Sequence, residues 1–280
     1  MPTVNPVHRS SVVEGRLTLA TATPVTVADQ TAKSTVYFTP YKGNRLALFN
    51  GVNWDVRTFA EVSVAVPSNT VTPFDVFVYD NGGTITLDAT AWTNDTTRAT
   101  AIVLQDGVYV KSGATGRRYL GTGRTTGVSG QTENSVSNRF LWNYYNQVSA
   151  SMVRRETTSS WTYSSATPRQ ANASTSNQLN FVVGVAEQII HGSIRIKCEV
   201  DILSDVIAFI GLDGTTAVAD FTANSVPVNP GTFLVVIHEA WAKITTVGYH
   251  YLVWVEQGNG SATMTLYGQS NFGVAADLMC

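Results

Sequence analysis

Two segments carry residue types that could do chemistry, and each lacks a group that the chemistry needs. Gly121–Gly127 has a GxGxxxG spacing, but no helical pattern and no Lys-Ser/Thr pair follow it to complete a phosphate-binding loop. His238 and Glu239 begin a zinc-protease-like motif, but Ala242 stands where the second histidine is required. The segment also reads as a strand, in which positions i and i+4 lie about 13 Å apart and cannot share a metal. We therefore predict neither a nucleotide loop nor a zinc site.

The remaining serines, histidines and carboxylates form no catalytic pattern. The chain has four histidines and no GxSxG motif, so we nominate no Ser-His-Asp set. No carboxylate pair indicates a glycosidase. Four aspartates could surround a calcium ion, but they lack calcium-loop spacing and we interpret them as solvated turn residues: Asp201, Asp205, Asp213 and Asp220. We expect a protein that is not an enzyme and has no catalytic residue, metal or cofactor.

The segment 117–180 has the most distinctive composition. It contains seven arginines, two glutamates and no lysine, whereas residues 181–280 contain nine acidic and three basic residues. Arginine beside tryptophan and tyrosine is typical of desolvated interface centres. The candidate interface residues are Arg117, Arg118, Arg139, Trp142, Tyr144, Tyr145, Arg154, Arg155, Trp161 and Arg169. A solvated loop with a partial core, or a nucleic-acid or glycan site, are the alternatives.

The elements that must position these residues are predicted to be strands. Charged residues are 14% of the 280 residues, against about 25% in an average globular chain, and small hydroxyl, amide and β-branched residues replace them. In the segment 193–202, polar residues alternate strictly with Ile194, Ile196, Cys198, Val200 and Ile202. This alternation predicts a strand with one face in a core and one in water.

Turn signals divide the chain into hairpins. Asn50-Gly51, Asp80–Gly83 and Asp106-Gly107 each separate two β-rich segments and predict three hairpins within residues 45–111. Gly258–Gly260 predicts a fourth hairpin, between 250–256 and 262–268. The predicted fold is all-β: an N-terminal arm (1–16), an N-terminal β-sandwich domain (17–130) and a C-terminal jelly-roll-like β domain (131–280).

Other features limit the cellular setting. Cys198 has the apolar parity of its strand, so we predict a buried, reduced thiol, and two cysteines are too few for a disulfide framework. No apolar run reaches the roughly 18–20 residues that a membrane helix needs, so we expect no membrane insertion. Met1–Arg16 lacks the apolar region of a secretory signal. The net charge of −2 does not indicate a nucleic-acid partner.

Several sequence segments, in order, carry a family resemblance. They are Tyr37–Asn44, Leu48–Trp54, Phe74–Asp80, Ala91–Arg98, Arg118–Gly121, Val128–Glu133, Phe140–Asn146 and Arg169–Asn172. Over roughly residues 16–190, the chain resembles a module frequent in tailed-bacteriophage virion structural proteins. The strand pattern of residues 190–280 is similar to a jelly roll of the complement-head or tumour-necrosis-factor type, an analogy at the level of fold.

The resemblance implies a structural role and supplies no catalytic residues. Such proteins are capsid decoration proteins, head fibres or tail-fibre modules on the outer surface of the virion, made in the host cytoplasm. The implied partners are the chain itself, as a homotrimer, and the major capsid protein or tail proteins. The chain lacks a fibrous shaft, which favours a compact decoration or head-fibre protein. The alternative is a tail-fibre or tail-spike component that binds a host-surface glycan.

Overall fold

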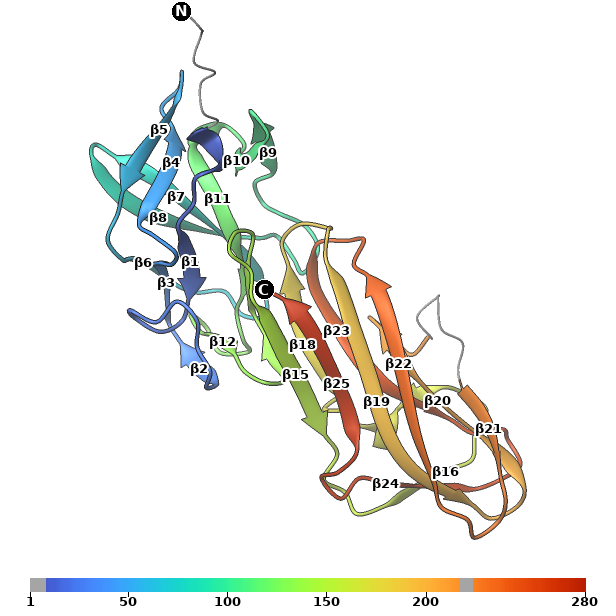
Figure 1. Cartoon of the computed structure of the whole chain (residues 1–280). Coiled ribbons are helices and arrows are strands. Elements are labelled where there is room, and N and C mark those ends of the chain that lie inside the picture. The colour runs from blue at the N-terminus through green and yellow to red at the C-terminus, as the bar shows by residue number, and fades with distance from the viewer. Residues whose placement is uncertain (1–8, 217–223) are drawn as a thin grey trace, which may run out of the picture.

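The chain folds almost entirely into β-strands, which confirms the predicted all-β class. The computed structural model describes residues 9–216 and 224–280. Helical structure in these residues is confined to two short 3₁₀ turns, η1 (Arg9–Ser11) and η2 (Ala171–Ala173). The strands form an elongated body, with the N-terminal sheets at one end and a long sandwich at the other (Figure 1).

The long sandwich consists of two sheets, which we name after their central strands. The β23 sheet has the order β2-β12-β13-β18-β23-β20-β21, and β17 also pairs with β23. Its strands are β2 (Gln30–Lys33), β12 (Thr132–Asn134), β13 (Asn138–Arg139), β17 (Arg169–Gln170), β18 (Gln178–Val183), β20 (Ser204–Leu212), β21 (Asn224–Val228) and β23 (Gly248–Gln257). The β19 sheet has the order β15-β25-β19-β24-β16, and β22 pairs with β19. Its strands are β15 (Ser149–Arg155), β16 (Trp161–Tyr163), β19 (Ile189–Val200), β22 (Leu234–Lys243), β24 (Met264–Tyr267) and β25 (Gly273–Met279).

Three further sheets, of three, six and two strands, form the N-terminal part. One has the order β1-β3-β6, another has β8-β7-β11-β10-β9 with β14 on β11, and β4 pairs with β5. The strands are β1 (Gly15–Thr18), β3 (Thr35–Pro40), β4 (Arg45–Phe49), β5 (Trp54–Thr58), β6 (Val62–Ala65), β7 (Pro73–Asn81), β8 (Thr84–Ala91), β9 (Ile102–Gln105), β10 (Val108–Lys111), β11 (Ala114–Arg124) and β14 (Leu141–Asn143).

Apolar side chains form one large core in the sandwich and another in the N-terminal sheets. The larger core also takes in Phe77, Tyr119 and Trp142, so it reaches into the N-terminal sheets. Pairing likewise crosses position 130, because β14 joins β11 and β2 joins β12. The domain limits at 16 and 130 stay a prediction. Of the predicted arm, residues 1–8 lie outside the described residues, and Val13 bridges to Leu46.

Three of the four hairpins are confirmed, and the alternating strand predicted at 193–202 is confirmed as far as Val200. The predicted core position of Ile202 is wrong, because this residue lies in the bend after the strand and is 50% exposed. Alternate β19 residues are buried, and the even-numbered positions Ile190–Val200 face the core. Strand pairs β4–β5, β7–β8 and β9–β10 form the three N-terminal hairpins. In the second, Gly82 and Gly83 have φ angles of 61° and 97°, which glycine adopts without a steric penalty.

The predicted hairpin at Gly258–Gly260 is wrong. This segment carries the chain from β23 to β24, which belong to different sheets. The N–H groups of Gly258 and Gly260 donate to the carbonyls of Ser165 and Ser164, at 2.8 and 2.9 Å. These bonds to a distant loop support the crossing, and β24 pairs with β19 and β16 instead of β23.

Candidate assembly surface

Two of the predicted interface residues, Arg118 and Trp142, lie inside the chain, and the half-buried Tyr145 contacts Arg118. Arg118 is 1% exposed, and its Nη1 donates to the Ser10 carbonyl at 2.7 Å. Its Nη2 donates to the hydroxyl of Tyr145 at 3.0 Å. Burial lowers the pKa of Arg118, and Tyr145 opposes this effect. Trp142 is 2% exposed and donates from Nε1 to Gln188 at 3.2 Å. These residues therefore stabilise the fold of one chain.

Three more candidates contact carboxylates of the same chain. Arg117 Nη1 lies 2.5 Å from Asp88 Oδ2. Trp161 Nε1 and Arg169 Nε donate to the two carboxylate oxygens of Glu256, at 2.6 and 2.7 Å. Burial raises the pKa of Glu256, and the donors from Trp161 and Arg169 act in the opposite direction. Of these three, Arg169 forms an ion pair with a carboxylate of the acidic C-terminal third, and Trp161 donates a hydrogen bond to the same group.

The other candidates are scattered. Arg139 donates to the Ser151 carbonyl at 2.7 Å, and Tyr144 packs among tyrosine rings, where burial raises its pKa to about 12. Arg154 and Arg155 are exposed neighbours in β15, and successive strand residues point to opposite faces. The ten candidates do not gather on one surface. Their role in an interface stays a prediction. Of the ten candidates, Arg154 and Arg155 are exposed, and the other eight are buried or half-buried.

Sequence reasoning missed a different surface, the outer face of the β19 sheet. Strand β22 alternates between buried and exposed residues. Four apolar side chains point outward along it, which we call the β22 stripe: Phe233, Val235, Ile237 and Trp241, at 55%, 50%, 61% and 54% exposed. Aligned exposed apolar residues of this kind mark interaction sites more often than isolated ones do.

The strand that carries the stripe is also an edge strand. Within the described residues, β22 pairs only with β19, and it lies beside β19 along the sandwich (Figure 1). An edge strand presents unpaired N–H and C=O groups, and soluble proteins usually protect a long edge with charges, prolines or a covering segment. Strand β22 has Glu239 and Lys243 on its outer face, and the other outward residues are apolar.

The stripe ends at an open hollow. The hollow has a volume of about 650 Å³ and is lined by Trp241, His191, Ile189, Met279, Glu187 and Asp277, among others. The rings of His191 and Trp241 are stacked with centroids 4.1 Å apart. Ile189 and Met279 are exposed beside them. This end of the face thus combines an apolar floor with an acidic rim.

Charges on the outer face separate by sign along the strands. Near the hollow lie Glu187, Glu239 and Asp277, with Lys243 as the only strong base in this group. At the opposite end, Arg155, Gly273 and Arg195 align across three strands, and Lys197 follows two residues later. There Glu199 accepts a hydrogen bond from the hydroxyl of Tyr267.

Within the described residues, most of these charges have no oppositely charged partner, although Asp277 accepts a hydrogen bond from the Ser151 hydroxyl at 2.8 Å and Arg155 donates one to the Ser270 carbonyl at 3.2 Å. In the ranges 9–216 and 224–280, the ion pairs include none formed by Glu187, Asp277, Arg155, Arg195 or Lys197. Glu239 lies 3.7 Å from His191 Nε2. Lys197 instead stacks over the rings of Phe233 and Tyr267, at 4.1 and 4.7 Å from their centroids.

The zinc-protease-like pair lies on this strand and separates as the strand prediction requires. His238 is buried on the inner face, where burial lowers its pKa, and Glu239 is exposed on the outer face. Among the residues that the structure describes, no cluster of three potential metal ligands occurs. One aspartate of the predicted turn set, Asp220, lies outside that part of the chain.

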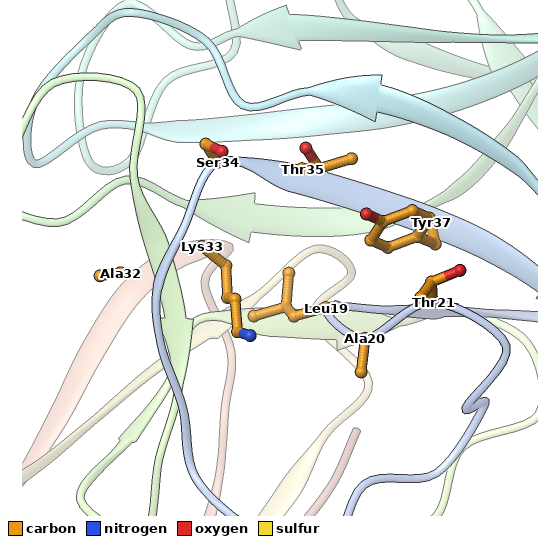
Figure 2. Close-up of a pocket in the computed structure, with 8 residues that line it drawn as sticks. All are labelled: Leu19, Ala20, Thr21, Ala32, Lys33, Ser34, Thr35 and Tyr37. Carbon is orange, nitrogen blue, oxygen red and sulfur yellow. The ribbon is translucent and has the colours of Figure 1, made fainter.

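Other hollows lie in the N-terminal part. Figure 2 shows one of about 340 Å³ in the N-terminal part, lined by residues 19–21, residues 32–35 and Tyr37. Lys33 supplies its only charged group, and Tyr37 and three small hydroxyl residues its other polar ones. A hollow of about 780 Å³ lies among the glycine turns at residues 49–51, 79–83 and 113–117.

No described helix is long and apolar enough to span a bilayer.

Comparisons with known proteins add only weak likenesses. No protein-family model and no curated protein matches the chain. It is similar to the insecticidal delta-endotoxin Cry8Ea1 of Bacillus thuringiensis at 7% identity and a TM-score of 0.25, covering 89% of this chain and 49% of that one. It is also similar to infectious bursal disease virus, Gx strain, at 12% identity and a TM-score of 0.22, covering 91% and 76%. The chain thus spans about half the length of the endotoxin. At these TM-scores neither likeness supports a function.

Proposed function

We propose that the chain is a structural protein on the outer surface of a tailed-phage particle, a capsid decoration or head-fibre protein that acts by binding. The observation that carries the proposal is the β22 stripe. It lies on an edge strand that, within the described residues, pairs with β19 along one edge and with no strand along the other. The order of family-like segments along residues 16–190 supports the phage assignment. The proposed partners are further copies of the chain, as a homotrimer, and the major capsid protein or tail proteins.

The stripe supports binding because its apolar side chains are exposed to water, and covering them by a partner is favourable. Apolar surface contributes roughly 25 cal/mol for each Å² removed from water, so covering four large side chains would favour association by several kcal/mol. Arginines of the 117–180 segment were the sequence-based candidates for this role, but most of their donors already serve the fold. The proposal therefore assigns assembly to the outer face of the β19 sheet.

Particle composition tests the proposal. Peptides of this chain should be found in purified virions by mass spectrometry, and antibodies against it should label the particle surface in electron microscopy. Hundreds of copies per particle would indicate the head, and a dozen or fewer would indicate a tail structure. Absence from purified particles of the phage that encodes the chain would contradict the proposal.

A second candidate is binding of a host-surface glycan, favoured by the hollow beside Trp241. An exposed indole ring can stack on a sugar, and Ser149, Gln188 and Asp277 line the same hollow with polar groups. Host polysaccharide should then quench tryptophan fluorescence in the native chain but not in a Trp241→Ala variant. Release of new reducing ends in the same mixture would instead indicate an enzyme.

A further inference from the structure

We propose that the occupant of the outer face is the same face of a second copy, related by a twofold axis that runs across the strands. This inference rests on the proposed function, because it names the partner of the assembly surface. It uses three observations: the β22 stripe, the separation of charges along the strands, and the fact that most of those charges form no ion pair within the described residues.

The charges determine the relative direction of the strands. The end near the hollow has three carboxylates and one lysine, and the far end has Arg155, Arg195 and Lys197 against Glu199 and the exposed Asp201 that follows β19. A twofold axis across the strands places the acidic end of each copy over the basic end of the other. An axis along the strands would instead place acid over acid and base over base, which is unfavourable in an interface.

The same axis also covers the apolar residues. A rotation about this axis reverses the direction of the strands but keeps their order across the sheet. Strand β22 of one copy therefore lies over β22 of the second copy. Because the direction is reversed, Trp241 of one copy lies near Val235 and Ile237 of the other. Two sheets packed in this way keep their strands within about 30° of one another, as in natural sandwiches. The stripe and the charges thus select one arrangement.

The contact is twofold whatever symmetry the rest of the assembly has. If the chain also forms the proposed trimer, the outer faces would join two trimers, and masses would be even multiples of the 30.2 kDa chain. A mass of exactly three chains, with no larger species at high concentration, would overturn the twofold contact. It would leave the proposed trimeric function in place.

Charge reversal gives a sharp test. The purified full chain is measured by light scattering coupled to size exclusion at 1–100 µM (roughly the range for such contacts). One variant carries Arg155→Glu with Arg195→Glu, and the other carries Glu239→Lys with Asp277→Lys. Each variant should have an association constant for dimerisation that is lower by roughly tenfold or more, because like charges then face each other. Arg154→Glu is the matched control, since Arg154 is adjacent to Arg155 but points away from the face.

Mixing the two variants separates the proposal from loss of folding. One variant has two acidic ends and the other has two basic ends, so an equimolar mixture should form a mixed dimer that neither forms alone. Native mass spectrometry would detect it. Failure of the mixture to associate, or equal weakening by Arg154→Glu, would overturn the arrangement. A wild-type chain that stays monomeric across the concentration range would overturn it as well.

Discussion

Arg169 donates a hydrogen bond of 2.7 Å to Glu256, a carboxylate with no exposed surface in the β23 sheet. Trp161 donates to the other oxygen of Glu256 from the β19 sheet, at 2.6 Å. The contact therefore links three strands, and it joins the arginine-rich segment to the acidic C-terminal third of the same chain. Arg169 also stacks over Tyr163, at 3.8 Å from the ring centroid.

Removing the arginine should destabilise the fold. We expect Arg169→Leu to lower the free energy of unfolding by on the order of 3 kcal/mol, because Glu256 would remain buried without its counter-charge. Adding Glu256→Gln to this variant should recover part of the loss. Urea denaturation of the two variants and the wild type measures both effects. An additive loss in the double variant would show that the ion pair is not the cause.

A second buried carboxylate should make stability depend on pH. Glu156 accepts hydrogen bonds from the Thr158 N–H at 2.8 Å and from Asn177 at 2.6 Å. Burial alone would raise its pKa, but these donors hold it at about 2, against 4.5 for an ordinary glutamate. Because the folded state has the lower pKa, the stabilisation is complete above about pH 5 and is lost as the pH falls toward 2.

The size of this effect is about 3 kcal/mol, because the pKa of Glu156 falls from 4.5 to about 2 and each pKa unit corresponds to about 1.4 kcal/mol. Unfolding free energies of the wild type and Glu156→Gln should therefore differ most at pH 7, and the difference should shrink progressively as the pH falls from about 5 toward 2. Urea denaturation at several pH values gives the comparison. A difference that stays constant from pH 7 to pH 3 would rule out Glu156 as the titrating group.

The two thiols should resist modification. Cys198 is fully buried, and burial raises its pKa to about 12; Cys280 is 1% exposed, and burial raises its pKa also. Both cysteines are free, which confirms the predicted buried thiol at Cys198. A polar thiol reagent should label neither residue rapidly in the native chain and both after unfolding in urea. Rapid native labelling of Cys198 would contradict this packing.

Local patterns predicted the strands well because alternation and turn residues act within a few positions. The path between sheets was not predictable in this way, since Gly258–Gly260 has the same turn residues whether the chain reverses or crosses. The intrachain partners of the arginines in residues 117–180 were not predictable for a similar reason. Asp88 and Glu256, the partners of Arg117 and Arg169, lie 29 and 87 residues away, and their spacing shows no pattern.

One signal for the assembly surface was present in the sequence. Residues 234–243 are apolar at both parities, as in Val235 with Val236 and Trp241 with Ala242. A strand with two apolar faces normally has both covered. Sequence alone cannot show which face the fold leaves bare, because that depends on the sheet order. The structure shows that Val236 and Ala242 face the core and that Val235 and Trp241 do not.

The bare face leads to the last prediction, which tests the β22 stripe itself. Ile237 and Leu104 are both 61% exposed, but Leu104 lies on β9 in the N-terminal part. A single Ile237→Asp substitution should weaken self-association by roughly 2 kcal/mol or more, because it places a charge in the centre of the covered area. Leu104→Asp adds the same charge at the same exposure and should leave association unchanged. Sedimentation equilibrium of the three proteins gives the association constants, and urea denaturation verifies that both variants fold. Equal association constants for wild type and Ile237→Asp would remove the stripe as an interface between copies of the chain.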